Sequence, residues 1–269
     1  MIATRVRDLM RPNLITCPPN MPLGAVAATL TRQRVHAIIV ADATGMPLGV
    51  VSDIDLIGGE WLGDDPAKLA QLRAKTAAQL MSAPAVTIDA AAPASEAAAK
   101  MRTLHIHRLV VTDMDRAIGV IAVSDLINGL APRSLDRAVV GDVMARGFVA
   151  CRAETTIAAA ARAMSERRSR SLVVVSGHGR PLGVVTGFDM LDYCDAGNPT
   201  DPVTRVMHPP LTIGPEASLR EAAEKMRSNR VHRLVVVDPA EPDSVPLGLI
   251  STSDLVTELA TPVPAGRVG

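Results

Sequence analysis

A short pattern that carries a carboxylate and a hydroxyl occurs four times in the 269-residue sequence. It consists of a Gly, two aliphatic residues, usually a Ser or Thr, two variable positions, an Asp, and then Leu or Met. The copies span residues 49–56, 119–126, 183–190 and 248–255. Their aspartates are Asp55, Asp125, Asp189 and Asp254, and the hydroxyl residues three positions earlier are Ser52, Thr186 and Ser251, with Ala122 in the second copy.

Each Asp lies where a predicted strand passes into a predicted helix, and two roles suit a carboxylate there. It can cap the helix by accepting hydrogen bonds from backbone N–H groups that have no partner in the helix. It can also accept the two hydroxyls of a ribose, while the nearby Ser or Thr and the free N–H groups hold a phosphate or a sugar. The residues alone leave both roles open.

A second recurring group carries positive charge or a titratable ring and precedes the middle strand of each unit. Its members are His36, His107, Arg108, Arg170, His232 and Arg233. Arg forms forked hydrogen bonds with phosphate, and His beside it adds a further donor. Any one of these side chains alone would be read as solvated at a strand edge, but their matched positions favour a shared site.

The elements between these groups also repeat. Each unit opens on a Met, at positions 10, 81, 144 and 207, and continues through a short extended run into an apolar stripe of helical spacing. A β-branched strand, a polar turn, the Gly-containing strand and a second helix follow. The stripes are Leu23/Val26/Ala27/Leu30, Ala94/Ala97/Ala98/Met101, Ile157/Ala160/Ala161/Met164 and Leu219/Ala222/Ala223/Met226. A unit of about sixty residues cannot bury these faces alone, so pairing of units is required.

The connectors divide the chain into two predicted modules, residues 1–134 and 135–260. The first contains units at about 5–60 and 76–130, with an added helix-like run at 66–73 between them. The second contains units at about 138–195 and 201–260. We expect the Pro/Gly-rich tail, residues 261–269, to be disordered.

Composition excludes several classes of function. With 28 basic and 28 acidic residues the formal charge is zero, which disfavours a nucleic-acid binder. The absence of a signal peptide and of an apolar run of eighteen residues predicts a cytoplasmic protein with no membrane partner. The three cysteines, Cys17, Cys151 and Cys194, are too scattered for a disulfide framework or a metal site. No catalytic motif occurs, so we expect no enzyme activity. The remaining histidines, His105, His178 and His208, are interpreted as surface residues.

The four units, with these strand and terminal motifs, resemble cystathionine-β-synthase (CBS) domains over about residues 5 to 260. The resemblance implies an α+β fold of four βαββα repeats, packed as two pseudo-twofold Bateman modules that pair repeat one with two and repeat three with four. It further implies a regulatory sensor, and in our interpretation a homodimer, that binds AMP, ADP, ATP or S-adenosylmethionine in clefts between paired repeats and needs no cofactor. The alternative is a scaffold for protein interactions that kept the fold and lost the ligand.

The resemblance also assigns roles to residues. The ribose-binding acid falls on Asp55, Asp125, Asp189 and Asp254, and its hydroxyl on Ser52, Thr186 and Ser251. Phosphate contacts fall on His107, Arg108, His232 and Arg233, which are similar to positions in the regulatory γ subunits of AMP-activated kinase, and on the position-matched His36 and Arg170. The adenine-facing strand includes Thr16, Thr87 and Thr212. Because Ala122 and Ala150 replace expected hydroxyl residues, repeats one and four are predicted to be the most complete sites.

Overall fold

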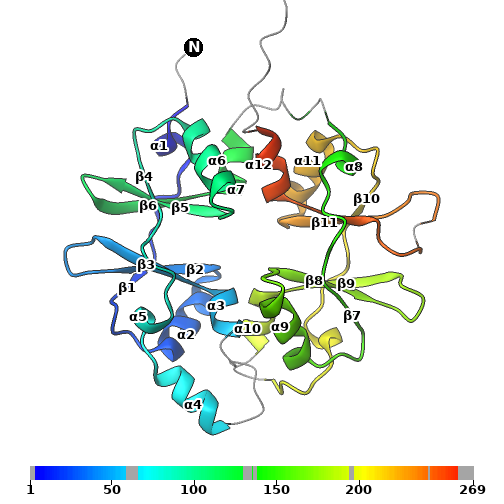
Figure 1. The fold of residues 1–269 in the computed structure, drawn as a ribbon, viewed down its shortest axis with the longest axis horizontal. Coiled ribbons are helices and arrows are strands. Elements are labelled where there is room, and N and C mark those ends of the chain that lie inside the picture. The colour runs from blue at the N-terminus through cyan, green and yellow to red at the C-terminus, as the bar shows by residue number, and fades with distance from the viewer. Residues whose placement is uncertain are drawn as a thin grey trace, which may run out of the picture.

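The computed structural model describes residues 4–58, 66–129, 135, 138–193, 197–241 and 243–259. Its strands form four small three-stranded sheets, which lie with their helices around the middle of the molecule (Figure 1). The predicted tail, Cys194 and most of the segment around the predicted module boundary lie outside the described residues. Among the helices that the structure describes, none is long and apolar enough to cross a membrane.

The first half of the chain contains two copies of one unit. Repeat one comprises α1 (Val6–Leu9), β1 (Thr16–Cys17), α2 (Leu23–Gln33), β2 (Ala37–Ala41), β3 (Pro47–Ser52) and α3 (Asp53–Gly58). The predicted extra helix is α4 (Pro66–Ala74). Repeat two comprises α5 (Ala77–Leu80), β4 (Thr87–Asp89), α6 (Ala94–Thr103), β5 (Arg108–Asp113), β6 (Arg116–Ala122) and α7 (Val123–Gly129).

The second half repeats the same order. Repeat three comprises α8 (Val140–Val143), β7 (Ala150–Arg152), α9 (Ile157–Glu166), β8 (Ser171–Val175), β9 (Pro181–Thr186) and α10 (Gly187–Tyr193). Repeat four comprises the 3₁₀ turn η2 (Val203–Arg205), β10 (Thr212–Ile213), α11 (Leu219–Asn229), β11 (Arg233–Val236), β12 (Gly248–Ser251) and α12 (Thr252–Leu259). The predicted α+β fold of four repeats is confirmed.

The sheets are equivalent down to their register. In each, the first strand pairs parallel with the middle strand, and the middle strand pairs antiparallel with the third. The matched pairs are Thr16 with Ile39, Thr87 with Val110, Ala150 with Val173 and Thr212 with Val235. The three predicted adenine-facing threonines and Ala150 therefore occupy one structural position.

The predicted helix stripes are the buried faces of α2, α6, α9 and α11, except that Ala223 is half-buried. Local capping supports two of these helices. Thr156 Oγ1 accepts the Ala159 N–H at 3.2 Å, and Ser218 Oγ accepts the Glu221 N–H at 3.1 Å. The helical turns that open each repeat, α1, α5, α8 and η2, were not predicted, because three or four residues are too few to show a helical period.

These opening turns cross over to the partner repeat. Val6 of repeat one packs in the core of repeat two, and Ala77 of repeat two packs in a core with repeat one. Val140 and Val203 make the same exchange between repeats three and four. The pairing is therefore one with two and three with four, as two Bateman modules require.

The recurring Met and the recurring Gly meet across each pair, which explains why both repeat. A Cβ on Gly49 would lie 2.7 Å from Met81 Sδ, and one on Gly183 would lie 2.9 Å from Met207 Sδ and from the His208 carbonyl oxygen. Gly119 meets Met10, and Gly248 meets Met144, in the same way. Only Gly allows this close approach of two chain segments.

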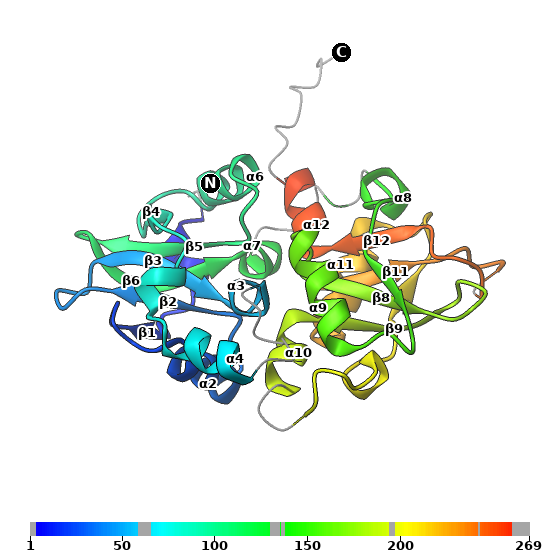
Figure 2. The same cartoon turned by 60° about the horizontal axis from the view of Figure 1, so that its bottom comes forward.

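The two modules face each other through helices, as the second view shows (Figure 2). Helix α3 contacts α9 and α10, and α12 contacts α6 and α7. One hydrophobic core contains Leu30 and Leu56 of repeat one together with Met164 and Met190 of repeat three. Burial therefore joins repeat one to three and repeat two to four, in addition to the pairing inside each module.

Candidate functional site

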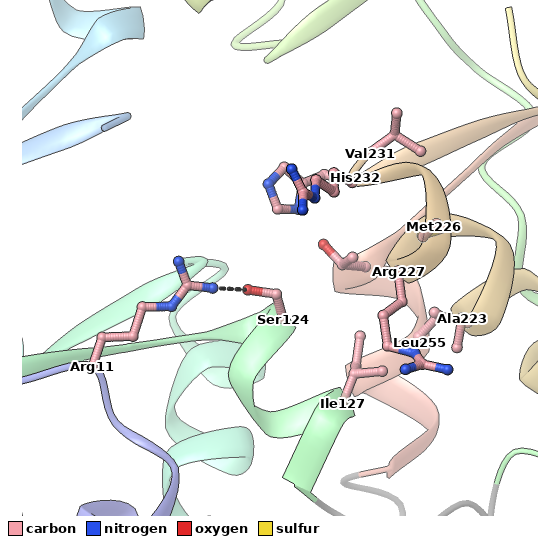
Figure 3. Close-up of a pocket in the computed structure, with 11 residues that line it drawn as sticks. Arg11, Ser124, Ile127, Ala223, Met226, Arg227, Val231, His232 and Leu255 are labelled. Atoms are coloured by element: carbon pink, nitrogen blue, oxygen red, sulfur yellow. Dashed lines mark hydrogen bonds between the residues drawn. The ribbon is translucent and has the colours of Figure 1, made fainter. Parts of the chain in front are cut away.

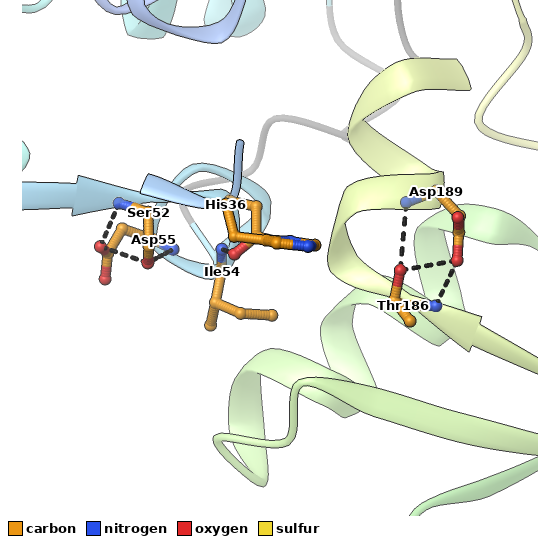
Figure 4. A network of polar contacts seen from close by, with 7 residues as sticks. His36, Ser52, Ile54, Asp55, Thr186 and Asp189 are labelled. Carbon is orange, nitrogen blue, oxygen red and sulfur yellow. Dashed lines mark hydrogen bonds and ion pairs between the residues drawn. The ribbon is translucent and has the colours of Figure 1, made fainter. Parts of the chain in front are cut away.

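Each recurring Asp is the third residue of the helix that follows its strand. Its carboxylate accepts a hydrogen bond from the N–H of the residue just before that helix. Asp55 Oδ2 accepts hydrogen bonds from the Ser52 N–H at 2.8 Å and from Ser52 Oγ at 2.6 Å. Thr186 makes the same bonds to Asp189, and Ser251 to Asp254. In the second repeat Ala122 supplies only its N–H, at 2.9 Å from Asp125 Oδ2. Each Asp therefore does cap its helix, but it does so from the third helical position, three residues after the N-cap residue. Figure 4 shows two of these pairs on α3 and α10.

The cap uses one oxygen of each carboxylate, and the second oxygen differs between repeats. Arg11 Nε donates to Asp125 Oδ1 at 2.8 Å, and His208 Nε2 lies 2.9 Å from Asp189 Oδ1. The second oxygens of Asp55 and Asp254 have no hydrogen bond or ion pair within the described part of the chain. Burial raises the pKa of Asp254 above its ordinary value, against the opposing effect of the Ser251 hydrogen bonds.

The predicted cations of different repeats influence one another electrostatically. Burial lowers the pKa of Arg108 and of Arg233 to about 10, and the charge of Arg170 is the second cause of this shift. Arg233 donates to the Ser171 hydroxyl, and among the described residues Arg108 Nε has no hydrogen-bond partner although it is shielded from water. Enclosed guanidinium groups that repel one another favour an anion between them.

The predicted histidines lie beside residues of the other module. The His36 ring contacts the Phe188 ring, with centroids 5.3 Å apart, and its centroid is 6.0 Å from that of His232. Ser253 Oγ of repeat four lies 3.4 Å from His107 Nε2 of repeat two. Because Phe188 and Ser253 each precede a recurring Asp, the basic group of one module faces the Asp-bearing helix of the other.

Two of these rings are neutral at neutral pH. Burial, followed by the charge of Arg170, lowers the pKa of His107 to about 4. Burial and the neighbouring His36 and Arg233 lower the pKa of His232 to about 4 as well. His36 Nδ1 lies 2.9 Å from the buried Asp53, and its hydrogen bond and charge hold the pKa of Asp53 below its ordinary value although burial opposes this. His107 and His232 therefore add no positive charge to the cluster at neutral pH, whereas Arg108, Arg170 and Arg233 do.

A cavity of about 340 Å³ lies between repeats two and four (Figure 3). The resemblance predicted clefts between paired repeats of one module, whereas this cavity lies between the two modules, beside α7, α11 and α12. It is lined by Arg11, Ser124, Ile127, Ala223, Met226, Arg227, Arg230, Val231, His232, Thr252 and Leu255.

Sequence reasoning predicted only His232 among the polar groups of this cavity. It missed Arg11, which lies 114 residues from its partner Asp125, and it interpreted His208 only as a surface residue. The usable signal was their position: each directly follows the opening Met of a repeat. The structure does not bring Thr16, Thr87 and Thr212 into this cavity.

Comparison with known proteins identifies the repeats. The family model described as the CBS domain matches residues 6–59, 77–132, 140–196 and 203–261. The uncharacterized protein MJ1404 of Methanocaldococcus jannaschii is 25% identical over 139 residues, which are 48% of this chain and 32% of that protein. The chain therefore spans about a third of that relative's length. A CBS domain-containing protein of Dictyostelium discoideum is 30% identical over 128 residues, 46% of this chain and 88% of that protein.

Among solved structures, protein MJ1225 of Methanocaldococcus jannaschii, proposed as an archaeal homologue of γ-AMPK, superposes with a TM-score of 0.83. The match covers 95% of this chain and 100% of that chain at 20% identity. At that identity the likeness concerns the fold, and it extends to the arrangement of all four repeats.

Proposed function

Because the chain belongs to the CBS domain family, with four copies of the domain, we propose that it is a regulatory sensor of adenosine ligands. The ligand class is AMP, ADP, ATP or S-adenosylmethionine, bound beside the Asp-bearing helices with the phosphate toward the arginine cluster. Binding changes the relative positions of the repeats, and this change regulates a protein partner.

The observation that carries this proposal is the hydrogen bonding of the Asp55 and Asp254 carboxylates, each of which uses only one of its two oxygens within the described residues. A carboxylate that served only as a cap would need one oxygen, and the Ser52 and Ser251 groups already occupy that oxygen. The second oxygen remains available for a ribose hydroxyl. The raised pKa of Asp254 supports this role, because a ligand can satisfy the free oxygen of a half-buried carboxylate.

The arginine cluster supports the phosphate part of the proposal. Arg108, Arg170 and Arg233 come from three repeats, and the charge of Arg170 contributes to the lowered pKa of both Arg108 and Arg233, so the three lie around one region of the molecule. A phosphate placed there would relieve their mutual repulsion and pair with guanidinium groups in forked geometry. The site residues remain predictions, and so does the cytoplasmic location. The homodimer is also a prediction, and light scattering of the purified protein would test it.

Thermal unfolding in the presence of each adenosine ligand tests the proposal. A ligand at a hundred times its dissociation constant stabilises the native state by about 2.7 kcal/mol, which raises the Tm of a protein of this size by roughly 5 °C. We expect such a shift with at least one of AMP, ADP, ATP and S-adenosylmethionine. No shift with any of them at millimolar concentration would favour the alternative, a scaffold that has lost its ligand.

The substitution Asp254→Ala tests the residue that the proposal depends on most. Loss of a hydrogen bond to a charged group weakens binding by about 1.5–3 kcal/mol, or roughly ten- to a hundredfold. Calorimetric titration would measure this loss, with Asp142→Ala as a control, because Asp142 caps the exposed turn α8 through the Val139 N–H. An unchanged affinity would return Asp254 to a purely structural role.

A further inference from the structure

The residue that follows each opening Met occupies one equivalent position in all four repeats. These residues are Arg11, Ser82, Ala145 and His208. Each pairs through its N–H and carbonyl group with the residue after the motif Gly of the partner repeat. The pairs are Arg11 with Val120, Ser82 with Val50, Ala145 with Leu249 and His208 with Val184, and all eight hydrogen bonds are 2.9–3.1 Å long.

This backbone pairing places each residue beside the strand that leads into the recurring Asp of the partner repeat. Where the side chain is a cation, it reaches that Asp: Arg11 bonds Asp125 at 2.8 Å and His208 bonds Asp189 at 2.9 Å. Where the side chain is Ser82 or Ala145, it carries no charge, and the second oxygens of Asp55 and Asp254 keep no partner within the described residues. The backbone is the same in all four cases, so the side chain alone makes the difference.

We propose that Arg11 and His208 are internal latches that close the sites at Asp125 and Asp189, so that only the sites at Asp55 and Asp254 bind adenosine ligands with full affinity. This inference rests on the proposed function and determines which of the four sites act. A latch occupies the oxygen that a ribose hydroxyl would need. The ligand must displace it or lose a hydrogen bond to a charged group, a loss of about tenfold or more in affinity.

The latch sites also differ from the open sites in their surroundings. Repeat two lacks the motif hydroxyl, since Ala122 replaces it, while repeat three keeps Thr186 and lacks a Thr on its outer strand, where Ala150 stands. The latched carboxylates are little exposed, 7% for Asp125 and 15% for Asp189, whereas their cations are 65% and 70% exposed. The cation therefore covers the carboxylate from the solvent side, from which a ligand would approach.

Exchange of the latch position between repeats tests the proposal, with AMP as the probe in calorimetric titration. We expect wild type to bind two AMP molecules tightly. Ser82→Arg should lower the affinity of one of them by about tenfold or more, while the matched control Ser82→Ala should leave both unchanged. His208→Ala, which copies the residue found at Ala145, should add a third site.

Four equivalent sites in wild type, or a weaker AMP affinity after Arg11→Ser and His208→Ala, would overturn the proposal, because these side chains would then contact the ligand. A readout without ligand separates this result from failure of the proposed function. In a double-mutant cycle of thermal unfolding, Arg11→Ser and Asp125→Asn should be non-additive. Additive losses would mean that the ion pair does not hold Asp125, and the latch proposal would fail whether or not AMP binds.

Discussion

Two histidines at the contact between the modules illustrate how burial decides the chemistry of a side chain. His107 and His232 have pKa values of about 4, so they are neutral where an exposed His would be partly charged. Phosphate recognition at neutral pH thus depends on Arg108, Arg170 and Arg233. A phosphate bound beside the rings would raise their pKa values, because an opposite charge favours the protonated form.

Acid should destabilise the protein through these two rings. Their pKa values are lower in the folded state than in the unfolded state, so their contribution to stability is present above about pH 6.5 and is lost as the pH falls toward about 4. Denaturant unfolding across this range should show a smaller loss of stability for the double substitution His107→Gln and His232→Gln than for wild type. His178→Gln, in an exposed turn, is the control. Equal losses in the double variant and in wild type would contradict the assigned pKa values.

Close packing between the strand Gly and the opening Met holds each pair of repeats together. In Gly183→Ala, the new Cβ would lie 2.9 Å from the His208 carbonyl oxygen, and this backbone atom cannot move without disturbing the bridge between the repeats. We expect a loss of about 1–3 kcal/mol in the free energy of unfolding. In the control Gly177→Ala the new Cβ would have no atom within 4 Å, so denaturant unfolding should show a change within about 0.5 kcal/mol. Equal effects of the two substitutions would show that the Gly–Met contact is unimportant.

Much of the architecture was predictable from periodicity. The stripes at i, i+3, i+4 and i+7 gave α2, α6, α9 and α11, and the predicted β-branched strands are observed as β2, β5, β8 and β11. The crossover of the opening turns was not predictable, because Val6 packs in another repeat's core through contacts that are distant in the chain. The same limit explains why Arg11 and His208 were missed. The partners of Arg11 and His208 depend on how the repeats pair in space, and a sequence pattern within one repeat does not show which residues of another repeat lie nearby.

The shared core makes the two modules one cooperative body. Repeats one and three contribute to the same hydrophobic cluster, so separating the modules would expose residues that are fully buried, such as Leu56 and Met164. We therefore expect a single transition in scanning calorimetry of the full chain. Met164→Ala should lower stability by about 2–5 kcal/mol and keep one transition, while Met46→Ala, at an exposed position, should change little. Two separate transitions would mean that the modules unfold independently.

A ligand bound where the two modules meet would couple the repeats. The basic group of one module faces the Asp-bearing helix of the other, so a ligand that contacts both favours one relative position of the modules. This is the physical basis of the proposed sensing, and it requires that the ligand bridge the Asp and the arginine cluster.

A crystal structure of the protein grown with saturating AMP tests the central claim most directly. We expect AMP at two places, with ribose hydroxyls on the second oxygens of Asp55 and Asp254 and with phosphates turned toward Arg170 and Arg233. Asp125 and Asp189 should keep their bonds to Arg11 and His208. An AMP molecule bound away from Asp55 and Asp254, or its absence from both places, would contradict the account.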